Sequence, residues 1–160
     1  MRLLSIDPAT TTGWAVLDDG QRISSGVLNF SSKKTAAPGE RFATAYNEFC
    51  LLVAEQKPDT IVYEAVKRWQ SSQAALVYGG ITAMLQTCSY RNNVPIYGVA
   101  PKSAKKVCTG NGNASKAQMI TWANEHFNIQ VQDDNEADAL AIGYTYLHER
   151  ANIQRTENNV

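Results

Sequence analysis

Two short apolar runs that each end at an acidic residue constrain the fold of this chain most. The first covers Arg2 to Ile6 and stops at Asp7, and the second covers Thr60 to Tyr63 and stops at Glu64. Runs of this length predict buried strands. Ligands of α/β proteins bind at the carboxyl ends of such strands. The pattern therefore predicts a sheet that presents two neighbouring carboxylates at one edge.

Further strands are expected on both sides of these runs. Gly13 to Leu17 and Ser24 to Phe30 read as strands, and Asp18-Asp19-Gly20 between them is a hairpin signal. Together with the first run they predict an antiparallel meander. Val94 to Val99 is expected to be the fifth strand.

Apolar residues recur at helical spacing in four other segments. The adjacent glycines Gly79 and Gly80 would weaken one of these helices by about 1 kcal/mol each, which the close approach of another segment would justify. The element order predicts a mixed α/β architecture, a five-stranded sheet flanked by helices. We expect one domain over residues 1–152 and a flexible polar tail over 153–160. The expected helices are Glu40–Gln56, Ser71–Tyr90, Ser115–Phe127 and Asp134–Asn152.

Composition excludes several classes of protein. Fifteen basic and fifteen acidic residues leave no net charge, which disfavours a protein that coats nucleic acid but permits a local basic face. No apolar stretch reaches the roughly 18 residues of a membrane span, and Asp7 interrupts the apolar stretch that a signal peptide would need. The cysteines, at positions 50, 88 and 108, form no C-x-x-C pair, so neither a disulfide framework nor a zinc site is expected. We therefore expect a cytoplasmic protein.

A third acid, Asp138, belongs to the last helix, where Asp134 and Asn135 share its face. Carboxylates held close together repel one another unless a cation lies between them. A site rich in oxygen and poor in histidine suits Mg²⁺ or Mn²⁺, and two such ions can drive phosphodiester cleavage. The alternative is that Asp7 forms a turn and the helix acids are caps.

Four lysines lie within fifteen residues that contain no acid. Their ammonium groups can contact phosphates as point charges, and the backbone around Gly110 and Gly112 can approach a phosphate closely. The alternative is a solvated helix–loop–helix face. The four are Lys102, Lys105, Lys106 and Lys116.

These motifs resemble the RuvC-type Holliday junction resolvases of the RNase H superfamily. The match comprises, in order, the first acidic strand, the second acidic strand, the basic segment with its glycine loop, and the final helix. It spans almost the whole chain. The matching segments are Ile6–Ala15, Tyr63-Glu64, Ala100–Gln118 and Glu136–Ile142.

The resemblance implies an RNase H-like fold and a homodimer that cuts four-way DNA junctions with Mg²⁺ or Mn²⁺, two ions per site. It makes Asp7, Glu64 and Asp138 the metal ligands and places Lys105 and Lys116 near the scissile phosphate. It also implies that the helix over residues 71–90 forms the dimer. The compact length suggests a phage-encoded branch, acting in the host cytoplasm.

The loop after Glu64 corresponds to one that offers an aromatic wedge to the junction in this family. Here the aligned position is nearer Lys67 than Trp69, so a role for Trp69 is a hypothesis, and a tryptophan here is more often packing. We expect Lys67, Arg68 and Trp69 to contact DNA.

Two positions depart from the family pattern. Asn135 stands where the family has a fourth metal-facing Asp or His, so it offers a carbonyl oxygen without negative charge, and Asp134 is a possible substitute. Ala9 replaces a common glycine.

Three other functions remain open at this stage. Residues 7–13 also resemble the phosphate loop of sugar kinases and actin-like ATPases, although those proteins need two such domains. An RNA-cutting relative and a junction-binding protein without activity are the others, and the three acids argue against the last.

Overall fold

The first three strands form the antiparallel meander that the sequence predicts. The computed structural model describes residues 1–31, 37, 39–67 and 71–157, with side chains up to residue 152. In the turn between the second and third strands, Asp19 and Gly20 have φ of 46° and 83°. Positive φ at both central residues is typical of a tight hairpin turn between twisted strands. The meander consists of β1 (Arg2–Asp7), β2 (Thr11–Asp18) and β3 (Gln21–Asn29).

The other two strands extend the sheet on the free side of β1. β4 (Thr60–Glu64) pairs with β1 in parallel, and β5 (Ile96–Val99) pairs with β4 in parallel. The strand order is therefore β3-β2-β1-β4-β5. The predicted fold class, a mixed five-stranded sheet flanked by helices, is confirmed.

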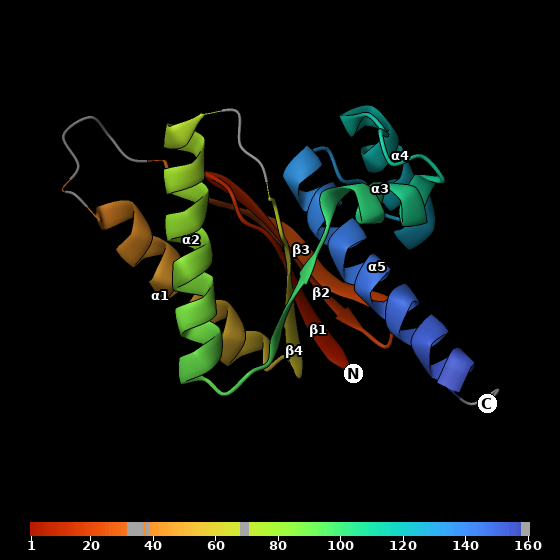
Figure 1. The fold of residues 1–160 in the computed structure, drawn as a ribbon, viewed down its shortest axis with the longest axis horizontal. Helices are drawn as coiled ribbons and strands as arrows, with labels where there is room; N and C mark the ends of the chain where they lie inside the picture. Colours follow the sequence, from red (N-terminus) through yellow and green to blue (C-terminus); the bar gives the residue numbers. More distant parts are fainter. Residues whose placement is uncertain (32–36, 38, 68–70, 158–160) are drawn as a thin grey trace.

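Helices cover both faces of the sheet (Figure 1). Two lie on one face and three on the other, so the central strands are buried on both sides. For this reason β1 carries apolar residues on both of its faces: Leu4 and Ile6 belong to one core and Leu3 to the other. The first face carries α1 (Glu40–Gln56) and α2 (Ser72–Arg91), and the second carries α3 (Pro101–Thr109), α4 (Lys116–Phe127) and α5 (Asp134–Glu157).

Helix α5 lies directly on β1 and β2, and two glycines permit this close packing. A Cβ atom on Gly13 would lie 1.8 Å from the carbonyl oxygen of Asn135, and one on Gly143 would lie 2.9 Å from Ser5 Oγ and Leu17 Cδ1. No side chain fits at 1.8 Å from a backbone oxygen. Gly13 therefore sets the depth at which the first turn of α5 lies on the sheet.

A polar contact fastens the same turn to β3. Ser25 donates a hydrogen bond to Glu136 and accepts one from Arg22 Nε at 2.6 Å, and the Arg22 guanidinium lies 3.9 Å from Glu136. Glu136 thus holds α5 to the sheet, and its carboxylate contacts β3 rather than the other acids.

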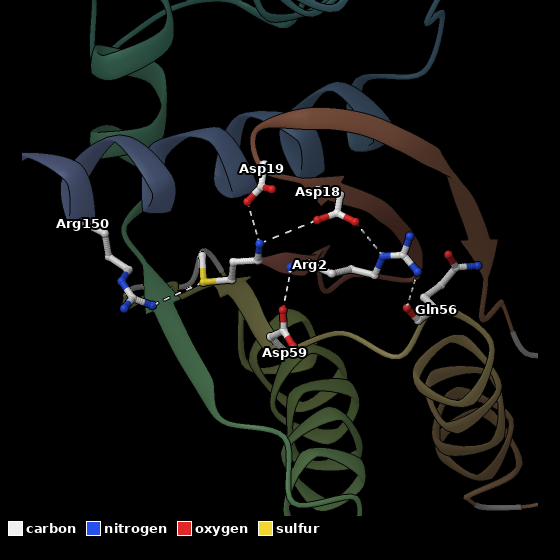
Figure 2. Close-up of polar contacts among 7 residues, drawn as sticks. Arg2, Asp18, Asp19, Gln56, Asp59 and Arg150 are labelled. Atoms are coloured by element: carbon white, nitrogen blue, oxygen red, sulfur yellow. Dashed lines mark hydrogen bonds and ion pairs between the residues drawn. The ribbon is translucent and has the colours of Figure 1, made fainter.

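The far end of β1 is fastened by Arg2 (Figure 2). Its Nε lies 3.3 Å from Asp18 Oδ2, and its guanidinium donates to the carbonyl oxygen of Gln56 at 3.2 Å. Its backbone N–H donates to Asp59 Oδ2 at 2.8 Å. The exposed ion pair contributes little stability, but these contacts join the hairpin to the connection between α1 and β4.

The two adjacent glycines of α2, Gly79 and Gly80, have different surroundings. A Cβ atom on Gly80 would lie 2.2 Å from the Phe42 ring of α1, whereas nothing lies within 4 Å of one on Gly79. The close approach that the sequence suggested is therefore present at Gly80, where a side chain packs against the helix backbone. At Gly79 no described residue approaches. Cys50 and Cys88 meet between the same two helices, with free thiols whose sulfurs lie 3.3 Å apart.

Several element boundaries differ from those expected. The basic segment forms a separate helix, α3, which the element order omitted; Pro101 fits its first turn, where the missing N–H costs nothing. β5 begins at Ile96, two residues later than expected. α5 continues to Glu157, five residues past its expected end. Residues 158–160 lie outside the described part, so the division into domain and tail stays a prediction.

Among the described residues, no helix has the length and apolar character needed to cross a membrane.

Gly13→Ala is expected to lower the free energy of unfolding by about 1–3 kcal/mol, because the new methyl group must displace the first turn of α5. Urea unfolding at fixed protein concentration measures the loss.

The matched control is Gly79→Ala, where the methyl group meets nothing and the higher helix propensity should raise stability by up to about 1 kcal/mol. Equal stability of Gly13→Ala and wild type would contradict the packing argument.

Candidate active site

Asp7 and Glu64 come together because β1 and β4 are parallel and in register. The register pairs Ile6 with Tyr63, and the next residue on each strand is an acid. Side chains alternate between the faces of a strand, so both acids point to the side opposite Ile6, toward α5. The predicted pair at the sheet edge is therefore present.

Asp138 completes the group from α5. It lies one turn after Asn135, whose carbonyl oxygen contacts the sheet at Gly13, and Gly13 pairs with Asp7 across β1 and β2. The contact that buries the helix start thus also brings Asp138 to the acid end of β1. Asp7 is 9% exposed, and Glu64 and Asp138 are half-buried.

Burial and nearby carboxylates raise the pKa of all three carboxyls. The pKa of Asp7 is well above its usual range because the group is buried and because Glu64 and Asp138 lie nearby. Burial and Asp138 raise the pKa of Glu64 to about 7. Burial also raises the pKa of Asp138, and the nearby Asp134 raises it further. The site therefore resists ionisation in the absence of a cation.

Two of the four predicted lysines act on these acids. Lys105 of α3 lowers the pKa of Glu64 and Asp138, and Lys116 of α4 lowers that of Asp7 and Asp138. Lys102 and Lys106 are exposed, and their Cβ atoms lie near the place that a Cβ on Gly112 would take. Of the four lysines, Lys105 and Lys116 thus lie toward the acids, and Lys102 and Lys106 lie toward the glycine loop.

The first turn of α5 gives its polar residues separate partners. Asn135 donates from its backbone N–H at 2.8 Å and from Nδ2 at 2.9 Å to Asp133 Oδ1, which caps the helix start. Its carbonyl Oδ1 accepts no hydrogen bond from the described residues. Asp134 forms an ion pair with Lys116.

The donor set fits a hard cation, although the side chains do not yet enclose one. Among the described residues, no group of three or more Asp, Glu, His or Cys side chains has an arrangement that could hold a metal ion. However, the buried Asp7 carboxylate has neither a hydrogen bond nor an ion pair in the described part of the chain. An all-oxygen set of this kind suits Mg²⁺ or Mn²⁺.

A hollow of about 540 Å³ that borders the loop after Asp7 was not expected from the sequence. Pro8, Arg41 and Tyr78 are among the residues that line it, and the Tyr78 hydroxyl donates to the carbonyl oxygen of Glu64 at 2.8 Å. Arg41 belongs to α1 and Tyr78 to α2, on the face of the sheet opposite α5. Their positions in the sequence relative to the acids form no motif that would predict the hollow. Only the fold brings them to this edge.

The loop after Glu64 is described only to Lys67, which is exposed. Arg68 and Trp69 lie outside the described residues, so DNA contact by this loop stays a prediction.

The melting temperature of the cation-free protein is expected to fall as pH rises from about 5 to about 8. Folded Glu64 keeps its proton up to a pKa of about 7, whereas an unperturbed glutamate ionises near 4.5. Between these values the folded state binds more protons than the unfolded state, and stability is lost as pH rises. Thermal unfolding in EDTA measures the trend.

Glu64→Gln, which cannot ionise, should show a shallower decline over the same range. A melting temperature of the wild type that is constant or rises with pH would contradict the raised pKa.

The sequence and the fold match known proteins over nearly their whole length. The family model described as crossover junction endodeoxyribonuclease RuvC matches residues 3–146. The chain is 24% identical to the RuvC of Caldicellulosiruptor saccharolyticus, over all of both chains. It is 32% identical to that of Anaeromyxobacter dehalogenans, over 94% of this chain and 83% of the relative.

A solved structure agrees in fold. The structure of T. thermophilus RuvC in complex with Holliday junction substrate superposes with a TM-score of 0.83 at 19% identity, covering 94% of each chain. The expected relation to this family is confirmed, while the expected phage origin stays a prediction. The chain therefore belongs to the RuvC family of crossover junction endodeoxyribonucleases, and its enzymatic class is that of a DNA-cleaving hydrolase.

Proposed function

We propose that this enzyme resolves four-way DNA junctions by metal-dependent hydrolysis at Asp7, Glu64 and Asp138. The observation that carries the proposal is the meeting of these carboxylates at one sheet edge, where burial raises the pKa of each. Like charges are held in a buried place at a cost in free energy, which a bound cation would offset.

The distribution of charge supports DNA as the substrate. The chain has no net charge, yet Lys105 and Lys116 act on the acids from α3 and α4, and Lys102 and Lys106 are exposed on α3 near the glycine loop. Ammonium groups at this place can bind the phosphates on either side of a cut. The structural neighbour bound to a Holliday junction supports the branched form of the substrate.

The residues of the site divide the work. Asp7, Glu64 and Asp138 would hold Mg²⁺ or Mn²⁺, two ions per site, and the carbonyl oxygen of Asn135 would add a neutral ligand. The ions, when bound, would supply an activated water and stabilise the leaving oxygen. Lys105 and Lys116 would bind the scissile phosphate and offset its charge as it approaches the carboxylates.

We further propose a homodimer formed through α2, acting in the cytoplasm where its DNA substrate lies. α2 supports this with Leu76 and Tyr90, which are 63% and 84% exposed. Large apolar side chains left in solvent on one helix suit packing against a second copy. Light scattering at micromolar concentration measures the mass.

Asp7→Asn, Glu64→Gln and Asp138→Asn should each lower cleavage of a synthetic four-way junction by at least about 100-fold, because each removes a charge that holds the cations. Junction affinity should persist, since fewer like charges then face the phosphates. Cleavage with Mg²⁺ or Mn²⁺ and gel-shift binding in Ca²⁺ measure the two quantities.

Glu136→Gln is a matched control, because this acid contacts Ser25 and Arg22 rather than the site. Forks, flaps, linear duplex and an RNA version of the junction define the specificity. A wild-type protein that binds the junction but never cuts it with either ion would refute the proposed activity.

A further inference from the structure

The ion pair between Lys116 and Asp134 joins the first residues of two helices. The Lys116 ammonium contacts Asp134 Oδ2, so the start of α4 is tied to the start of α5. The pair lies at the end of α5 that approaches Asp7.

Helix stability does not account for this pair. α4 already has a capping box, in which the Ser115 side chain accepts from the Gln118 backbone and the Gln118 side chain accepts from that of Ser115. A cation at a helix N-terminus opposes the helix dipole. The Lys116 side chain is 76% exposed, and exposed ion pairs contribute little to folding.

The pair does decide where a positive charge lies. Asp134 precedes Asp138 by four residues, about one turn of α5, so the two acids share a helix face. The Lys116 ammonium lowers the pKa of both Asp7 and Asp138, which come from different elements, while the Asp134 carboxylate beside it raises the pKa of both. Lys116 is therefore held beside the carboxylates although most of its side chain is in solvent.

We propose that Asp134 is a positioning residue for the reaction, one that holds the Lys116 ammonium beside the carboxylates to meet the scissile phosphate. This inference rests on the proposed function. It assigns Asp134 to the lysine instead of to a metal ion. An ammonium group has three N–H donors, so Lys116 can keep Asp134 and still bind a phosphate oxygen.

Positioning of this kind lowers the barrier because the lysine is ordered before the DNA arrives. A free lysine side chain loses rotamer freedom on binding a phosphate, whereas one already paired with Asp134 has lost part of it. The effect is expected on the rate of the bound junction rather than on its affinity, since other lysines contribute to binding.

Single-turnover cleavage of a four-way junction at saturating enzyme tests the proposal through a double-mutant cycle. Asp134→Asn should lower the rate about tenfold with unchanged junction affinity, and in a Lys116→Ala background it should have no further effect. Asp134→Glu should restore most of the rate. Asp133→Asn, which removes the neighbouring charge but keeps an amide able to cap α5, should leave the rate near that of wild type.

Two outcomes would overturn the assignment. If the losses from Asp134→Asn and Lys116→Ala multiply in the double variant, Asp134 does not act through Lys116. If Asp134→Asn raises the Mg²⁺ concentration needed for half-maximal rate and Lys116→Ala does not, Asp134 serves the metal ion instead.

A readout independent of cleavage separates this proposal from the proposed function. The ¹⁵N signal of the Lys116 ammonium should be sharp in the wild type, broadened in Asp134→Asn, and shifted when the junction binds. A signal that the junction leaves unchanged would overturn the positioning role even if the enzyme cuts. Conversely, a shift without any cutting would refute the nuclease activity while supporting the contact.

Discussion

The close packing of α5 on the sheet at Gly13 is the contact on which the site depends. Gly13 of β2 pairs directly with Asp7 of the neighbouring strand β1. The space that a side chain of residue 13 would fill is taken by the backbone of Asn135. This depth places Asp138 one turn later beside the acids of β1 and β4. A larger residue at position 13 would move the helix start, and with it the third carboxylate.

The same packing makes the site electrostatically costly. Asp7 is almost fully buried beside Glu64 and Asp138, and no hydrogen bond or ion pair from the described residues relieves it. Proteins seldom bury like charges together unless the arrangement serves a ligand. The raised pKa values, the lysines of α3 and α4 and the family relation thus converge on the sheet edge where DNA would be cut.

Each polar residue around the start of α5 contacts a different partner. Glu136 fastens the helix to Ser25, Asp133 caps it through Asn135, and Asp134 holds Lys116. Asp138, the next acid on the helix, has no such partner among the described residues. Neighbouring acids in the sequence therefore differ in role because the elements around them differ.

The sequence by itself determined the strands, four of the five helices in the described part of the chain and the acids at two strand ends, because apolar periodicity and chain breaks are local. It did not separate α3 from the basic segment, because a nine-residue helix is shorter than the stretch over which apolar spacing identifies a helix. Only the tertiary structure decided that Gly13 admits α5, that Lys105 and Lys116 reach the acids while Lys102 and Lys106 do not, and that Arg41 and Tyr78 line the adjoining hollow. These facts depend on distances between segments far apart in the chain, which are set by packing and leave no local pattern.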